Sequence, residues 1–473
     1  MKRLTLTVMA TALLAGCALG PDYRRPAAET PATYRGAEAD ANANAAASYA
    51  DLDWWQTYDD PALQTLIRRA LERNPDLAIA VARVDQARAS LGVNRLQQLP
   101  QISATAGETR NETSALLTSF TLPRERTNDV LQATATWEID LWGRLRRATE
   151  AGRAELLGAE YARRGVVIGL VGDVASAYFN LLSLDEQLEI TRRTVETRQK
   201  FVDLTRARHD RGVVSGLDVA TAEAQLATAQ ANIPELQRQI ALIEDQLSFL
   251  LGGPPGDVAR AGRVQTAAPV PPAGLPSSLL ERRPDILAAE QSLVAANARV
   301  GVAKAALFPT LSLTGAIGSA SSSLDGLLTG PAQTFSLGGN LLVPLLDAQR
   351  NLFQVDLANA RKREAILNYQ KTIQGAFRDV ADALIARRKY TELETAQQAQ
   401  VMALRRADEI ALARYRGGFS SYFDVINADR DLFTAELDLA AAARNARLAS
   451  VQLYRALGGG WRTTEADGAL KAR

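Results

Sequence analysis

The chain has 473 residues, of which 47% are hydrophobic and 23% charged, a balance typical of folded proteins rather than disordered ones. Lysine and arginine number 54, aspartate and glutamate number 53, and no long block of one sign occurs. A nucleic-acid-binding protein is expected to carry a basic patch or stripe, so this composition argues against nucleic acid as a partner.

The N-terminus has the pattern of an export signal. Lys2 and Arg3 precede an apolar run over residues 4–14, which is too short to cross a membrane as a mature helix. The run ends in Leu14-Ala15-Gly16-Cys17, which resembles a bacterial lipobox. This predicts a signal peptide over 1–16 and a diacylglycerol on the thiol of Cys17. The alternative is a buried cysteine that happens to follow an apolar run, but Cys17 is the only cysteine of the chain and has no disulfide partner.

The remainder of the chain is a duplication. Pro75 and Pro284, each followed by Asp, are 209 positions apart, and the later pair Asp218 and Asp424, each followed by Val, is 206 apart. Two copies indicate a pseudo-symmetric unit rather than a solenoid array. The expected organisation is a lipid-anchored N-terminal segment over 17–62, repeat 1 over 63–260, a Pro-rich linker over 261–280, repeat 2 over 281–461 and a tail over 462–473.

Each repeat is expected to contain one hairpin of two strands. Alternation of apolar and polar residues is clearest from Leu131 to Leu141, and similar alternation begins at Gln101, Thr310 and Thr334. The predicted hairpins cover about 101–142 and about 310–346, with loops at 113–128 and 320–333.

Strands with one apolar and one polar face fit a transmembrane barrel, although a half-buried soluble sheet gives the same pattern. Four strands are too few to close a barrel around a channel, and an open sheet edge is not tolerated in lipid. Membrane insertion therefore requires other copies, and three copies would supply twelve strands.

Very long helices follow each hairpin. No proline interrupts the segment between Arg144 and His209, or that between Arg350 and Tyr415. A helix of this length would extend roughly 95 Å, far more than an ordinary domain requires. The next helix of each repeat shows a seam with apolar or small residues spaced alternately three and four apart, which predicts coiled-coil packing. The seams comprise positions 226, 229, 233, 236, 240, 243, 247 and 250, and positions 432, 435, 439, 442, 446, 449, 453 and 456.

Several segments together resemble the TolC family of outer-membrane efflux channels, in its lipoprotein branch of OprM-like and NodT-like components of resistance-nodulation-division pumps. They span roughly residues 17–461 and are Cys17–Tyr23 with Pro26, Trp54-Trp55, Asn74–Leu77, Trp137–Arg144, Glu281–Asp285, Leu307–Pro309 and Arg414–Gly418. The resemblance implies a membrane α/β fold: a β-barrel of four strands per protomer and twelve per trimer, continued by a periplasmic helical barrel.

The resemblance also implies candidate gate residues in the turns at 209–218 and 415–424. Asp218 and Asp424 would point into the narrow entrance, with Asn427 one helical turn beyond Asp424. Both aspartates equally fit helix N-capping after the turn, and capping is compatible with a gate role. Tyr415 is a candidate hydrogen-bonding residue of the gate or, alternatively, a packed aromatic. An arginine usual in the family is replaced here by Ser420.

The sequence contains no recognisable set of catalytic residues. The only histidine, His209, cannot build a metal cluster or a catalytic dyad, and no phosphate-binding Gly-Lys-Ser/Thr loop occurs. We therefore expect no catalytic, cofactor-binding or metal-binding residue, and energy must come from a partner.

The sequence thus predicts a lipid-anchored channel of the outer membrane that extends into the periplasm. Its expected partners are two further copies in a homotrimer, a periplasmic adaptor protein, an inner-membrane resistance-nodulation-division pump and outer-membrane lipid. Drugs or other small toxic compounds are the favoured cargo. The alternatives are export of metal ions or of proteins by a type I system, and a lipid-anchored coiled-coil spacer without conductance.

Overall fold

A computed structural model describes residues 18–36, 60–114, 116, 124–260 and 276–459. The predicted signal peptide, Cys17, Trp54-Trp55 and the C-terminal tail lie outside the described residues. The chain forms two compact units, which are described separately. Unit 1 comprises Met1–Ala27, Arg83–Glu160 and Ala288–Gln370, and unit 2 comprises Ala28–Ala82, Tyr161–Leu287 and Lys371–Arg473.

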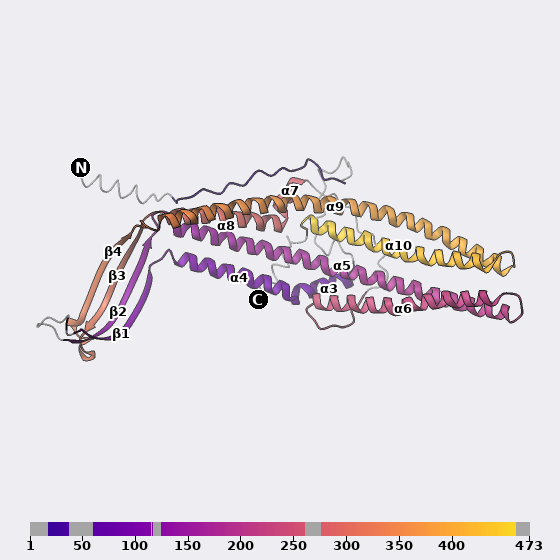
Figure 1. Ribbon diagram of the computed structural model, residues 1–473, viewed down its shortest axis with the longest axis horizontal. Helices are drawn as coiled ribbons and strands as arrows, with labels where there is room; N and C mark the ends of the chain where they lie inside the picture. The colour runs from indigo at the N-terminus through magenta and orange to yellow at the C-terminus, as the bar shows by residue number, and fades with distance from the viewer. Residues whose placement is uncertain (1–17, 37–59, 115, 117–123, 261–275, 460–473) are drawn as a thin grey trace. The chain divides into compact units, whose positions relative to one another are not determined.

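Unit 1 contains one antiparallel sheet with strand order β1-β2-β3-β4 (Figure 1). Its strands are β1 (Gln101–Glu112), β2 (Glu125–Ile139), β3 (Thr310–Ser321) and β4 (Gln333–Leu342). Each repeat contributes one hairpin, as predicted, and β2 pairs with β3 to join the two hairpins.

The pairing register places the apolar positions of all four strands on one face. Ala104 lies opposite Ala133, which lies opposite Ile317, which lies opposite Phe335. The neighbouring residues form an equivalent polar row of Thr105, Gln132, Gly318 and Thr334. Because directly opposed residues share a face, these rows give the sheet an apolar and a polar side. Toward the loop ends of β1 and β2, Glu108 and Asp129 lie opposite each other on the same side as the apolar row.

The hairpin boundaries differ from the prediction at both ends of β2, and β4 ends at Leu342 rather than near 346. β2 begins at Glu125 rather than after residue 128, because ion pairs Arg110–Glu125 (2.9 Å) and Arg124–Glu112 (2.9 Å) extend the ladder. β2 ends at Ile139 rather than near 142, because the Asp140 carboxylate accepts hydrogen bonds from the backbone N–H of Leu145 (3.2 Å) and Arg146 (2.9 Å). Asp140 thereby starts the following helix instead of continuing the strand.

The helices agree with the absence of proline in the long segments. The first group is α3 (Pro61–Arg73), α4 (Pro75–Leu96), α5 (Arg144–His209) and α6 (Gly216–Leu250). The second group is α7 (Pro276–Arg282), α8 (Pro284–Ala305), α9 (Ala348–Arg416) and α10 (Tyr422–Ala456). α5 has 66 residues and α9 has 69. Short 3-10 helices, η2 (Leu324–Gly326) and η3 (Gly330–Ala332), lie between β3 and β4.

In unit 2, α6 packs along α5 and α10 packs along α9 (Figure 1). Every position of both predicted seams is buried or half-buried, from Leu226 to Leu250 and from Leu432 to Ala456. The coiled-coil prediction is therefore confirmed. α5 also contains an 18-residue stretch apolar enough to cross a membrane, but most of that stretch is buried within the fold, so helix packing accounts for it.

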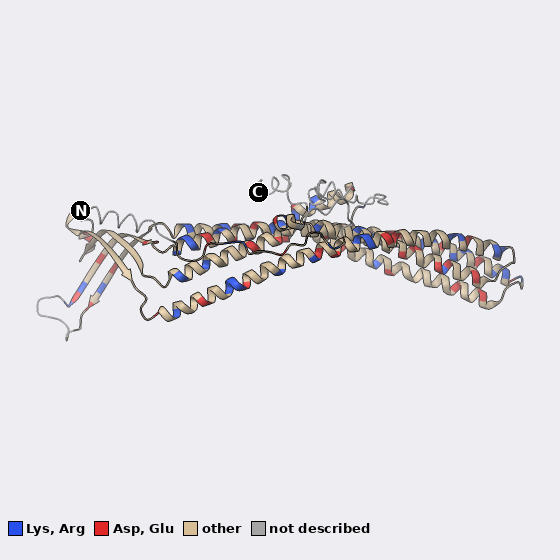
Figure 2. Ribbon diagram, turned by 90° about the horizontal axis from the view of Figure 1, so that it is seen from above, with Lys and Arg blue, Asp and Glu red and all other residues tan. Residues whose placement is uncertain are grey.

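Acidic and basic residues alternate along the helices without a long block of one sign (Figure 2). The mixed pattern agrees with the near-zero net charge of the sequence.

Candidate functional site

The candidate site lies where α5 turns into α6 and α9 turns into α10. Gly212 (φ 72°) and Gly418 (φ 78°) adopt left-handed backbone conformations that glycine tolerates best. The N–H of each glycine donates to a carbonyl three residues earlier, to His209 at 2.7 Å and to Tyr415 at 3.1 Å. The two turns are thus built in the same way, as the sequence duplication suggests.

Asp218 and Asp424 both act in helix caps. The Asp218 carboxylate accepts hydrogen bonds from the backbone N–H and the hydroxyl of Ser215, both at 3.0 Å. The Asp424 carboxylate accepts the corresponding bonds from Ser421, both at 3.2 Å. A carboxylate three residues after a serine N-cap completes a capping box, so these bonds stabilise the first turns of α6 and α10. Asp424 is nevertheless solvent-exposed and Asp218 half-buried, so both charges stay available to solvent.

Tyr415 is packed rather than hydrogen-bonded in this structure. Its side chain is only 4% exposed, and within the described residues its hydroxyl has no hydrogen-bond partner. The Arg208 guanidinium lies 4.6 Å from the ring centroid, and the Tyr422 ring lies 5.6 Å away. Asn427 is half-buried one turn beyond Asp424 on α10. His209 ends α5 and is exposed, as expected of a turn residue.

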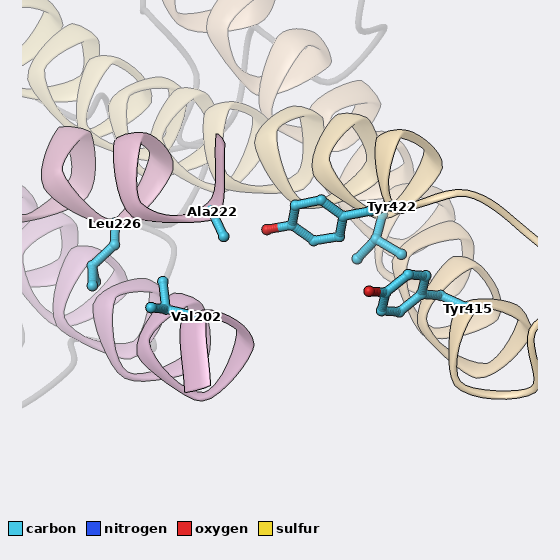
Figure 3. Packing of buried hydrophobic residues seen from close by; sticks show 6 residues of the cluster. Val202, Ala222, Leu226, Tyr415 and Tyr422 are labelled. Atoms are coloured by element: carbon cyan, nitrogen blue, oxygen red, sulfur yellow. The ribbon is translucent and has the colours of Figure 1, made fainter. Parts of the chain in front are cut away.

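An apolar cluster joins the two helical hairpins behind these turns. Val202 of α5 faces Ala222 and Leu226 of α6, while Tyr422 of α10 points its ring toward α6 (Figure 3). Tyr415 of α9 completes the contact. Burial of these side chains favours the arrangement in which the hairpins lie together.

A buried guanidinium connects three of these helices. Arg198 of α5 is 4% exposed, and its Nε donates to Asp429 of α10 at 2.8 Å. Its Nη1 donates to the carbonyl of Gln225 of α6 at 2.8 Å, and its guanidinium lies 5.2 Å from the Phe433 ring. Sequence reasoning missed Arg198. The positions buried with it on α5 are 191, 194, 202 and 205, and three of them are threonine, so no apolar spacing in the sequence marked this side of the helix.

Acidic groups gather next to this guanidinium. Burial raises the pKa of Asp408 of α9 to about 6, and repulsion from Asp429, Glu409 and Glu436 adds to the rise. Burial also raises the pKa of Asp429, although Arg198 opposes the shift. Glu436 is held by Arg405 (2.6 Å) and Arg193 (3.3 Å). The packing of α9 against α10 is therefore sensitive to protonation.

Among the described residues, no group of three or more His, Cys, Asp or Glu side chains is placed to hold a metal ion. A family model described as outer membrane efflux protein matches residues 66–253 and 275–459. The chain belongs to the outer membrane efflux protein family. The match falls into two segments, in agreement with the duplication, whereas the exact repeat and linker boundaries stay predictions.

Relatives cover nearly the whole chain. The chain is 36% identical over 471 residues to the probable efflux pump outer membrane protein TtgC of Pseudomonas putida, covering 98% of this chain and 96% of TtgC. It is 33% identical over 452 residues to the cation efflux system protein CusC of Escherichia coli, covering 95% and 96%. The open-state crystal structure of the outer membrane channel MtrE of Neisseria gonorrhoeae superposes with a TM-score of 0.85 at 30% identity, covering 94% and 99%.

The predicted family and fold class are confirmed, and the chain is an outer-membrane channel component of an efflux system. The family consists of transport channels rather than enzymes.

Proposed function

We propose that three copies of this chain close a twelve-strand barrel in the outer membrane and passively conduct small toxic compounds, including drugs, to the exterior. The observation that carries the proposal is the apolar row that crosses all four strands from Ala104 to Phe335, with a polar row next to it on the other face. A twelve-strand barrel with this alternation has its apolar side in lipid and its polar side around a watery lumen.

The free edges of the sheet support assembly with further copies. All twelve residues of β1 and all ten of β4 are exposed, and these strands end the sheet order. Edge strands present unpaired backbone groups, which in lipid must be paired by another strand. Pairing of β4 with β1 of the next copy satisfies both edges, and three such pairings close the ring.

Exposed apolar side chains on the helices support the same assembly. Leu352, Phe353 and Leu357 of α9 are exposed, as are Val93 and Leu96 of α4. Large apolar side chains at an exposed helix surface favour contact with another protein surface. We assign these surfaces to contacts between copies.

The turns of the candidate site supply a docking surface for a periplasmic adaptor. Val213, Leu217, Phe419 and Phe423 are each at least 64% exposed and are contributed equally by the two turns. We propose that the adaptor contacts these side chains and that an inner-membrane resistance-nodulation-division pump supplies energy. Asp218 and Asp424 would then form a ring of six carboxylates at the entrance of a trimer, with Tyr415 and Asn427 packed beside it.

The cargo and the anchor complete the proposal. Acylation of Cys17 would hold each copy at the outer membrane. The names of relatives refer to toluene, antibiotic and solvent efflux pumps and, for CusC, to cation efflux. The first group favours small organic compounds as cargo, and CusC favours cations as the second candidate.

A strain that lacks this gene tests the cargo. It should accumulate more of a fluorescent dye, an antibiotic or toluene than its parent, and expression of the native chain should restore efflux. Sensitivity to a panel of metal salts is measured in parallel as the discriminating arm. Unchanged dye and drug accumulation together with raised metal sensitivity would replace drug efflux by cation efflux.

A further inference from the structure

Residues 18–25, which we call the strap, follow directly after the predicted anchor residue and are bound by helices of both repeats. The backbone N–H of Leu19 donates to the carbonyl of Trp142 at 3.0 Å. The carbonyl of Pro21 accepts from the Asn297 side chain at 2.7 Å. The strap thus has a defined place within unit 1.

The C-terminal half of the strap ends on one buried carboxylate. Glu290 of α8 has a side chain only 7% exposed. It accepts a hydrogen bond from the Tyr23 hydroxyl at 2.9 Å and two from the Arg25 guanidinium, both at 2.7 Å. A bidentate pair with arginine fixes orientation as well as distance, and loss of its bonds would leave the carboxylate buried and unsatisfied.

The N-terminal half is held by α5 and by close backbone approach. Arg147 of α5, whose side chain is 8% exposed, binds the Asp22 carboxylate at 2.8 Å and the Leu19 carbonyl at 3.3 Å. Gly20 has φ 104°, and a Cβ atom built on it would lie 2.4 Å from the Cα of Gly301. Both the conformation and the space therefore require glycine at position 20.

The set of α8 residues that contact the strap is present in only one of the two repeats. Glu290, Asn297 and Gly301 lie seven and four residues apart, which places them along one face of α8. Their counterparts 209 positions earlier are Val81, Arg88 and Gly92, of which only the glycine is retained. No atom lies near a Cβ built on Gly92 within the described residues. The duplicated helix therefore differs at the positions that bind the strap.

We propose that the strap is a clasp that fixes where the anchor residue leaves the protein, beside the junction of β2 and α5. Ala18 approaches Gly143 so closely that a Cβ built on Gly143 would lie 2.7 Å from the Ala18 Cα. Ala18 is the residue that directly follows the predicted anchor residue in the sequence. Trp137 and Trp142, aromatic residues of the type found at membrane interfaces, lie at the same junction.

The clasp rests on the proposed acylation of Cys17 and gives the strap a role beyond tethering. A lipid attached at this point enters the bilayer next to the apolar face of the sheet, so strand insertion begins at a fixed depth. If the strap is released from Glu290, the chain keeps its lipid, but the distance between the lipid and the strands is no longer fixed. Trimer insertion should then fail without any loss of acylation.

The test uses the full chain in the outer membrane with Glu290→Gln and, from the strap side, Tyr23→Phe combined with Arg25→Gln. The matched control is Asp85→Asn, which breaks an exposed ion pair with Arg88 on α4. Three quantities are measured: labelled palmitate on the chain, trypsin cleavage after Arg24, and the fraction of chain in heat-modifiable trimers. The double variant Arg25→Glu with Glu290→Arg swaps the two charges and tests whether a reversed ion pair restores the trimer.

We expect all variants to carry native amounts of label. Both clasp variants should be cleaved at least tenfold faster, because cleavage requires local release of the strap, and should lose at least two thirds of the trimer. The control should match the native chain, and the charge exchange should recover at least half of the loss. Native cleavage or native trimer content in both clasp variants would overturn the clasp. Absence of label from the native chain would overturn it as well, while the channel function would still be decided by conductance.

Discussion

At the scale of single residues, the gate region depends on one buried ion pair. Removal of the Arg198 side chain leaves the half-buried Asp429 without its partner and frees the Gln225 carbonyl. Loss of one partner of a fully buried pair costs about 3–5 kcal/mol, and we expect about 2 kcal/mol here because the Asp429 side chain keeps 22% exposure. Arg198→Ala should therefore raise amide hydrogen exchange around Gln225 and Asp429 roughly 30-fold.

The matched control is Arg206→Ala, which removes an exposed ion pair between α5 and Glu223 of α6. Exposed pairs contribute about 0.2–1 kcal/mol, so exchange should rise less than about fivefold. Equal exchange in the two variants would show that Arg198 does not hold the hairpins together.

Asp408 makes the same region sensitive to pH. Its pKa of about 6 in the folded chain exceeds the value of about 3.9 for an unfolded aspartate, so the folded state holds this proton more tightly. The stability contributed by protonated Asp408 is present at low pH and falls as the pH rises from about 4 to about 6. Hydrogen exchange of α9 and α10 should accordingly be faster at pH 7 than at pH 4.5, relative to intrinsic rates, and Asp408→Asn should flatten this difference. An unchanged pH profile in Asp408→Asn would refute the assignment.

The two interpretations of Asp218 and Asp424 can be separated by substitution. Gln three residues after the N-cap can still complete a capping box but carries no charge. Asp218→Gln with Asp424→Gln should therefore keep the turns folded and lower the cation-to-anion permeability ratio at least threefold. Ser215→Ala with Ser421→Ala keeps both charges and should leave that ratio within twofold of native. The reverse outcome in bilayer recordings would assign the two aspartates to capping alone.

At the scale of secondary structure elements, the face of each strand decides where a charge is tolerated. Leu337 lies opposite Gly315 on the apolar face, and Ser336 lies opposite Ala316 on the polar face. A basic residue at the lipid-facing midplane costs about 2–4 kcal/mol. Leu337→Arg should therefore reduce the heat-modifiable trimer on gels, while Ser336→Arg should leave it near native. Similar losses in both variants would mean that the apolar face does not contact lipid.

The periodicity of the sequence predicted these elements well because it reports one face at a time. The alternation from Leu131 onward reflects which face of the sheet each side chain takes, and the seam from Leu226 to Leu250 reflects burial along one side of α6. Strand ends were less accurate, because they depend on side-chain contacts such as Asp140 with Leu145 and Arg110 with Glu125. The role of Arg198 was not predicted, because Asp429 is distant from it in sequence and its other partner is the backbone carbonyl of Gln225.

At the scale of the whole molecule, duplication explains both the regularity of the chain and its exceptions. Both repeats supply a hairpin, a very long helix and a turn capped by Ser and Asp. Only repeat 2 carries Glu290 and Asn297, which bind the strap. The sequence could not assign a role to Glu290 and Asn297, because the strap that they bind occurs only once. The duplication therefore offers no second copy of the strap with which to compare it.

The central claim is that copies of this chain assemble into a conducting pore. The most direct test is to reconstitute purified protein into planar lipid bilayers and record single-channel currents. We predict discrete conductance steps from the heat-modifiable trimer, retained by Ser336→Arg and lost with Leu337→Arg. Absence of any conductance, with only monomers recovered from the membrane, would contradict the channel and favour a lipid-anchored coiled-coil spacer.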